Sequence, residues 1–220
     1  LIGPNGSGKT TIFNLLTGVY SPTEGEIRLD STRIDGRRAF EIAKLGMART
    51  FQNIRLFPNM TVLENVMAAR HLRGHQTLAD AVLGTRRHHA EERAAREWAL
   101  ELLKIFGLDA VADETATGLP YGSQRRLEIA RALATDPKVL LLDEPAAGMN
   151  PQESRDLMNL IRWLRDERSL TVVLVEHNMK VVMGICETVQ VIDHGEVVAV
   201  GTPEEIQSNS AVIEAYLGGG

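Results

Sequence analysis

Hydrophobic residues along the chain follow two patterns, which predict buried strands and amphipathic helices. Residues 139–143 and 171–175 are continuous apolar runs, typical of parallel strands buried on both faces. A long amphipathic helix ending at Gly107 is predicted by apolar residues at helical spacing, which are Ala90, Ala94, Trp98, Leu102 and Ile105. This spacing places Trp98 on the buried face. The alternation of strands and helices predicts a wound α/β fold.

Residues 55 to 137 are predicted to be mostly helical. A capping box from Thr61 to Glu64 starts one helix, and another runs from Ser123 to about Ala134. Near the end of the chain, residues 188–193 and 196–200 flank an Asp193-His194-Gly195 turn and predict a hairpin. We therefore expect residues 1–54 and 138–220 to form an α/β core with a parallel sheet. Residues 55–137 would be an α-helical subdomain inserted into it.

Composition narrows the function classes. The 220 residues carry a net charge of −5 and are 44% hydrophobic, as in an ordinary globular protein. The acidic balance argues against nucleic acid as a partner, which usually requires a basic face. No apolar run approaches the roughly 18 residues of a transmembrane helix, so a membrane role would come through a partner. Because the chain begins at Leu1, on what reads as the end of a strand, we expect an N-terminal portion to be missing.

The glycine-rich stretch Gly3-Pro4-Asn5-Gly6-Ser7-Gly8-Lys9-Thr10 is the strongest chemical motif. It has the form G-x-x-x-x-G-K-[ST] between an apolar strand end and a helix, so its backbone N–H groups can surround phosphates. Lys9 would reach the β- and γ-phosphates, and the Thr10 hydroxyl would bind Mg²⁺. The probability that a chain of this length matches this motif by chance is roughly one in a hundred. We interpret residues Gly3 to Thr11, Thr11 included, as a nucleotide site on a P-loop NTPase core of the RecA-like type.

Two acids complete the predicted site. Asp143 ends a buried strand, where it can hold Mg²⁺, and Glu144 follows directly. Glu144 could deprotonate the attacking water. A strand-end acid that caps the next segment is the alternative, and it is less favourable beside a P-loop. A P-loop GTPase or small-molecule kinase is a second class, but the base-recognition motif N-K-x-D is absent.

Further motifs in order resemble those of ABC-type ATPases, over the entire chain. Leu119-Pro120-Tyr121-Gly122-Ser123-Gln124 is similar to the signature L-S-G-G-Q. Gln52 stands where the family has its Q-loop, Ala147-Gly148-Met149-Asn150 its D-loop, and His177 its switch histidine. The resemblance also implies that the family's first strands, with the aromatic residue that stacks on adenine, lie outside this sequence.

Several segments resemble one subfamily, the ATP-binding subunits of high-affinity branched-chain amino acid importers. They are residues 48–57, Tyr121-Gly122 within the signature, residues 143–148, residues 176–180 and the ending 215–218. Related subunits handle urea or short amides. The lipopolysaccharide-export ATPase is also similar, with a signature closer to L-S-G-G. Soluble ABC proteins that act on DNA or ribosomes carry long heptad arrays or tandem copies, which this chain lacks.

The resemblance implies a composite mechanism with ATP and Mg²⁺. Two ATPase subunits, identical or related, would bind head to tail. The P-loop with Glu144, His177 and Gln52 as catalytic residues would act on one ATP, while Thr10, Gln52 and Asp143 hold its Mg²⁺. Pro120, Tyr121, Gly122 and Ser123 would contact the ATP of the second subunit.

The resemblance also implies partners and a location. Gln52 and its loop would couple closure of the dimer to a transmembrane permease docked near residues 51–57. Alternatively, the apolar side chains of that loop could pack into the core of the chain itself. A substrate-binding protein would be an indirect partner, and the subunit would lie on the cytoplasmic face of the inner membrane.

Two positions depart from the family pattern. Pro120 replaces the signature serine and has no hydroxyl to donate, and Asn150 replaces the D-loop aspartate but keeps a capping side chain. Neither is part of the P-loop or of the Asp143–Glu144 pair, so we still expect ATP hydrolysis.

Overall fold

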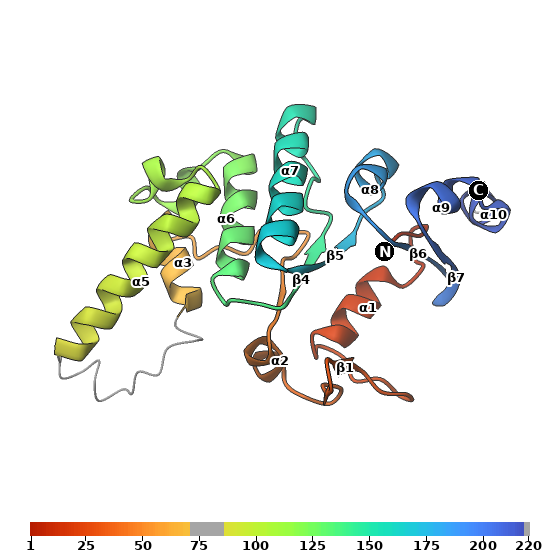
Figure 1. Cartoon of the computed structure of the whole chain (residues 1–220), viewed down its shortest axis with the longest axis horizontal. Coiled ribbons are helices and arrows are strands. Elements are labelled where there is room, and N and C mark those ends of the chain that lie inside the picture. Colours follow the sequence, from red (N-terminus) through yellow and green to blue (C-terminus); the bar gives the residue numbers. More distant parts are fainter. Residues whose placement is uncertain (71–85, 218–220) are drawn as a thin grey trace.

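The computed structural model describes residues 1–70 and 86–217, laid out along one long axis (Figure 1). Its helices are α1 Lys9–Leu16, α2 Ala39–Leu45, α3 Val62–Arg70, α5 Arg86–Ile105, α6 Tyr121–Leu133, α7 Pro151–Arg168, α8 Met179–Ile185, α9 Pro203–Ser208 and α10 Ser210–Leu217. Its strands are β1 Arg28–Leu29, β2 Thr32–Arg33, β3 Met47–Arg49, β4 Val139–Asp143, β5 Thr171–Val175, β6 Val189–Asp193 and β7 Glu196–Gly201. Within the described ranges, no helix combines the length and the apolar composition needed to cross a bilayer.

A parallel sheet in the order β3-β4-β5 forms the centre, as the two apolar runs predict. The segment Leu1–Ile2 extends it, since the Leu1 amino group donates to the Leu174 carbonyl and Ile2 exchanges hydrogen bonds with β6. The predicted hairpin is confirmed as the antiparallel pair β6-β7, with its turn at Gly195 in the left-handed region (φ 83°). The P-loop strand end therefore lies between β5 and β6.

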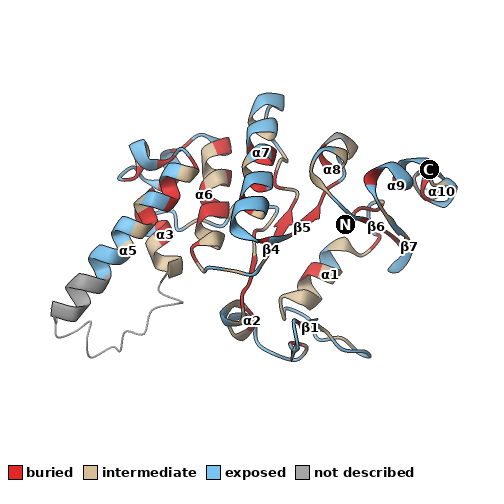
Figure 2. Ribbon diagram, viewed as in Figure 1, coloured by how far each residue is buried: buried red, intermediate tan, exposed pale blue. Residues whose placement is uncertain are grey.

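Buried residues concentrate on β4 and β5 and on parts of α3, α5, α6 and α7 (Figure 2). Leu140 and Leu142 are fully buried, and their hydrophobic cluster includes Leu157 and Ile161 of α7. The same cluster continues through α3, α5 and α6. The helices of residues 55–137 thus share a continuous apolar core with the sheet; their assignment to a separate subdomain stays a prediction.

Helix α5 differs from the predicted stripe. Trp98 is half-buried and Ala94 is exposed, whereas the side chain of Ala90 lies outside the described residues. The buried positions of the helix are Ala99, Leu102 and Leu103, and Phe106, directly after the helix, is also buried. The Arg70 guanidinium lies 4.3 Å from the centre of the Trp98 ring, so a long cationic side chain of α3 covers this aromatic surface. Trp98 therefore packs against the edge of the core as a partly buried residue, not as a fully buried one.

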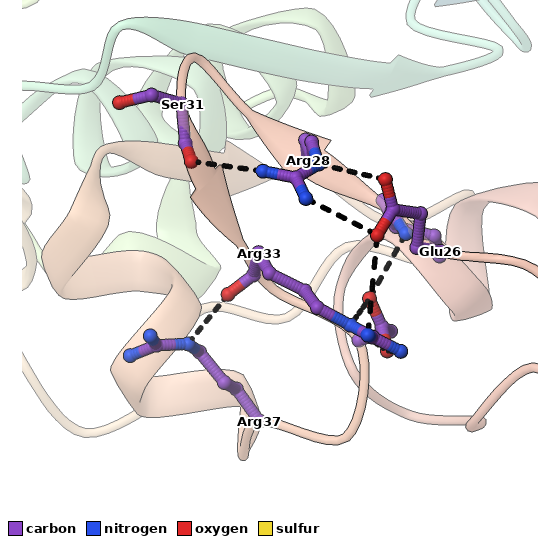
Figure 3. Close-up of polar contacts among 7 residues, drawn as sticks. Glu26, Arg28, Ser31, Arg33 and Arg37 are labelled. Atoms are coloured by element: carbon purple, nitrogen blue, oxygen red, sulfur yellow. Dashed lines mark hydrogen bonds and ion pairs between the residues drawn. The ribbon is translucent and has the colours of Figure 1, made fainter.

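Charged side chains line the hairpin β1-β2 and the residues that flank it (Figure 3). Arg28 donates to the Glu26 carboxylate at 2.8 Å, and Arg33 pairs with Asp35 at 2.7 Å. The Arg33 contact and the backbone N–H of Ile27 lower the pKa of Asp35 from 3.8 to about 2. Since the folded pKa is depressed, this stabilisation is present above pH 3.8 and is lost as the pH falls toward 2.

The difference in burial between Trp98 and Phe106, the residue that follows α5, can be tested by stability. Phe106→Ala should lower the free energy of unfolding by roughly 3–5 kcal/mol, because it empties a fully buried site. Trp98→Ala should cost clearly less, since part of its ring already contacts solvent. Urea denaturation of both variants gives the comparison. If both variants lost the same free energy of unfolding, Trp98 would contribute to stability as much as a fully buried core residue.

Candidate active site

The P-loop connects the end of the Leu1–Ile2 segment to helix α1. Gly6 and Gly8 have φ of 81° and 104°, the left-handed conformation that glycine adopts without strain. Gly8 is the N-cap of α1, and the helix starts at Lys9 with its first N–H groups free of acidic neighbours in the first turn. A glycine turn that leads into a helix N-terminus is a ready site for phosphate.

Gly3 fits because it has no side chain. A Cβ atom there would lie 2.2 Å from the Ile192 carbonyl oxygen and 2.6 Å from Ser7 Oγ. The other end of the loop is tied to the same hairpin, since Gly195 N–H donates to the Ser7 carbonyl at 3.0 Å. The β6-β7 hairpin therefore fixes the loop from two points.

Lys9 lies folded over this loop. Its Nζ donates to the carbonyl oxygens of Gly3 at 2.7 Å and Pro4 at 2.8 Å. Burial lowers the pKa of Lys9, and the negative charges of Glu144 and Asp143 oppose that shift. The ammonium group thus shares one electrostatic environment with the two acids that the sequence pairs with the P-loop.

Asp143 ends β4 and is buried, with a charged partner that the sequence did not reveal. Arg49 Nη2 lies 3.1 Å from Asp143 Oδ2, and Arg49 Nη1 donates to Asn14 Oδ1 of α1 at 2.7 Å. Both side chains of the ion pair are at most 10% exposed. The register explains why Arg49 reaches Asp143: β3 and β4 are parallel neighbours, so residues at their carboxyl ends lie close together.

Glu144 is the centre of the polar contacts at this edge. Gln52 Nε2 donates to Glu144 Oε2 at 3.1 Å, and His177 Nδ1 lies 3.4 Å from Glu144 Oε1. The three side chains follow β3, β4 and β5 respectively. The structure therefore brings together the three residues predicted to be catalytic, with one carboxylate between an amide and an imidazole.

The residues predicted to hold Mg²⁺ have suitable chemistry. Thr10 offers a hydroxyl, Asp143 a carboxylate, and Gln52 an amide oxygen, since its nitrogen faces Glu144. Mg²⁺ prefers hard oxygen ligands, usually a few from the protein together with water and phosphate oxygens. In the described part of the chain no group of three or more His, Cys, Asp or Glu side chains could hold a metal by itself.

The signature residues lie at the start of α6, which begins at Tyr121 rather than at the predicted Ser123. Pro120 is its N-cap and is exposed, as is Tyr121. Gly122 is buried against Glu153, where an added Cβ would lie 2.9 Å from the carboxylate. Ser123 lies in the first turn of the same helix.

The D-loop region packs beside these signature residues. Asn150 caps α7 through a reciprocal capping box with Glu153, as the sequence predicts. The signature segment and the D-loop of one chain are thus neighbours through Gly122 and Glu153.

Arg125 is a second residue that the sequence analysis missed. It is fully buried, and its guanidinium reaches the backbone carbonyls of Phe51, Gln52 and Glu144. The available signal was an Arg and a Glu three residues apart, Arg125 and Glu128, on an otherwise apolar helix face. Sequence spacing alone does not show which loops such a pair contacts.

Two family models match the chain. The ABC transporter model matches residues 1–147. A model described as branched-chain amino acid ATP-binding cassette transporter matches residues 196–220.

Curated relatives are similar over nearly the whole chain. The high-affinity branched-chain amino acid transport ATP-binding protein BraF of Pseudomonas aeruginosa is 50% identical over 99% of this chain and 86% of its own. LivG of Escherichia coli, which carries the same description, is 47% identical with the same coverage. The lipopolysaccharide export system ATP-binding protein LptB of Haemophilus influenzae is 35% identical, over 99% of this chain and 84% of its own.

Solved structures with the same fold are ATP-binding cassettes. One, the ADP conformation of a cassette of an ABC transporter, has a TM-score of 0.81 at 29% identity and covers 99% of this chain and 86% of its own. A dimeric cassette in a post-hydrolysis state with ADP and phosphate has a TM-score of 0.76 at 30% identity, with coverage of 92% and 83%.

The tight packing at Gly3 gives a test of the loop. Gly3→Ala should weaken ATP binding by at least about tenfold, equivalent to 1.4 kcal/mol, because the methyl group must displace the loop from Ile192. Gly184→Ala is the control, since an added Cβ there meets nothing within 4 Å. Titration with a fluorescent ATP analogue compares the two. Equal affinities would mean that the loop adapts without cost.

Proposed function

This chain belongs to the ABC transporter family of ATP-binding cassettes, and from that premise we propose that it energises an importer of branched-chain amino acids. It hydrolyses ATP to drive transport. The observation that carries this proposal is the Glu144 carboxylate, held between Gln52 and His177 beside the P-loop. The names of the relatives at 47% and 50% identity supply the substrate class. The export alternative has less support, at 35% identity.

Hydrolysis needs a base and fixed phosphates. The loop from Gly3 to Thr11 holds the phosphates, and Lys9 leaves its carbonyl partners to contact them. Glu144 takes a proton from the attacking water as the bond to the γ-phosphorus forms, and ADP leaves with the electron pair of the broken bond. His177, 3.4 Å from the carboxylate, orients that carboxylate and the phosphate. Mg²⁺ bound by Thr10, Gln52 and Asp143 would neutralise phosphate charge.

A second ATPase subunit completes each site in this proposal. The related dimeric cassette holds ADP and phosphate, and head-to-tail pairing would set α6 of one subunit against the ATP of the other. Tyr121, Gly122 and Ser123 lie in the first turn of α6, so in such a pair their N–H groups and the helix dipole would face the phosphates. That arrangement supports recognition by the backbone even with Pro120 in place of serine.

A groove near the Q-loop suits a permease. A cavity of about 280 Å³ lies between α1, α2, β3 and α6, and Phe51 is part of its wall. Val19 lines this cavity, and Tyr20, Phe40 and Phe57 are further apolar side chains of residues 19–57; each of the four is at least 46% exposed. Exposed apolar surface of this kind commonly marks a site where a partner binds. We place the permease here, with the subunit on the cytoplasmic face of the inner membrane and a substrate-binding protein beyond the permease.

Transport by the assembled complex tests this function. The complete transporter in vesicles, with ATP supplied on the subunit side, should take up leucine and should not take up urea. Phe57→Glu should lower leucine uptake at least about tenfold, because a charge replaces an apolar docking residue at a desolvated contact. ATP binding by the isolated subunit should stay within twofold of wild type.

Trp163→Glu is the matched control, since Trp163 is 42% exposed on α7. Uptake of urea in preference to leucine would contradict the substrate class. Normal leucine uptake with Phe57→Glu would instead mean that the permease binds another surface, and the proposed substrate class would stand.

A further inference from the structure

Arg125 is the largest fully buried side chain among the described residues, at 0% exposure. A buried guanidinium is costly unless its donors and its charge are matched. Three of its hydrogen bonds reach residues outside its helix: Nη1 donates to the Phe51 carbonyl at 2.6 Å, and Nη2 donates to the Gln52 carbonyl at 2.7 Å and the Glu144 carbonyl at 3.3 Å. One side chain of α6 thus joins the backbones of two residues of the active site.

Glu128 balances the charge and adds a further contact. Its Oε2 accepts from Arg125 Nη1 at 2.9 Å, and its Oε1 accepts from the backbone N–H of Arg55 at 3.2 Å. The pair therefore holds the segment around Gln52 at Phe51, Gln52 and Arg55. This segment is otherwise exposed at Gln52 and has no regular secondary structure.

The backbone of Glu144 is held equally closely. Glu144 has a φ of 44°, in the left-handed region that residues with a side chain rarely adopt. Its N–H donates to the Val175 carbonyl at 2.9 Å, and its own carbonyl receives Arg125. A strained residue keeps such a conformation only where its surroundings fix it, and it commonly does so at functional sites.

Burial of an ion pair is seldom the most stable solution for a helix face, because apolar residues of similar volume are often as stable or more so. Two of the acceptors of Arg125 are the backbone carbonyls of Gln52 and Glu144. Glu144 carries the catalytic carboxylate, and the Gln52 side chain donates a hydrogen bond to it. We propose that Arg125 is a positioning residue for ATP hydrolysis, which holds Gln52 and Glu144 in register. Lysine cannot do the same, because a single ammonium group lacks the planar fork that spans several carbonyls.

The test is steady-state phosphate release by the complete protein, normalised to the subunits that bind a fluorescent ATP analogue. Arg125→Lys should lower kcat by about tenfold or more and change KM for ATP by less than threefold, because small displacements of catalytic groups cost turnover more than binding. Arg125→Met should lower kcat further. Arg126→Lys is the matched control, since Arg126 is the next residue of the helix and its ion pair among the described residues is a 4.0 Å contact with Asp156.

A purely structural role gives a different result. In that case kcat per binding-competent subunit would stay within twofold of wild type in both Arg125 variants, or kcat and ATP affinity would fall together; either result overturns the proposal. If neither Arg125 variant folds, Glu128→Gln decides. It keeps an acceptor for Arg55 but removes the charge that fixes Arg125, so kcat should fall severalfold at constant KM. Unchanged kcat in that variant would also overturn the proposal.

Discussion

Parallel pairing of β3, β4 and β5 is the constraint on which the active site depends. The register sets Asp143 beside Val175 and Arg49 beside Leu141, so the residues that follow these strands emerge at one edge. The Leu1–Ile2 segment delivers the P-loop to the same edge through its bonds to β5 and β6. Gln52, Glu144 and His177 follow three strands of this sheet, so the sheet itself brings Gln52 and His177 to the Glu144 carboxylate.

Two buried arginines organise the charge at that edge. Arg49 ties Asp143 to α1 through Asn14, which connects the strand acid to the helix that follows the P-loop. Arg125 ties α6 to the backbones of Gln52 and Glu144, and its partner Glu128 also lines the groove assigned to the permease. The nucleotide site, the signature helix and the proposed docking surface therefore share a few charged contacts.

Much of this arrangement was predictable from the sequence because the motifs are local. The P-loop, the buried strand ending at Asp143, the hairpin and the cap at Asn150 each depend on neighbouring residues, and each is found as predicted. Tertiary contacts decided the rest. Arg49 and Asp143 are 94 residues apart, and the exposure of Trp98 depends on how α3 covers α5. No spacing rule within α6 indicates that Arg125 points to two distant loops.

Glu144, held in place by Gln52 and His177, is the proposed base for ATP hydrolysis. Phosphate release by Glu144→Gln in the assembled transporter tests this role most directly, with Glu187→Gln, an exposed carboxylate beside Arg165, as the control. Glu144→Gln should lower turnover at least about a hundredfold, as expected for loss of a general base, while ATP stays bound. Turnover equal to that of the control would contradict it.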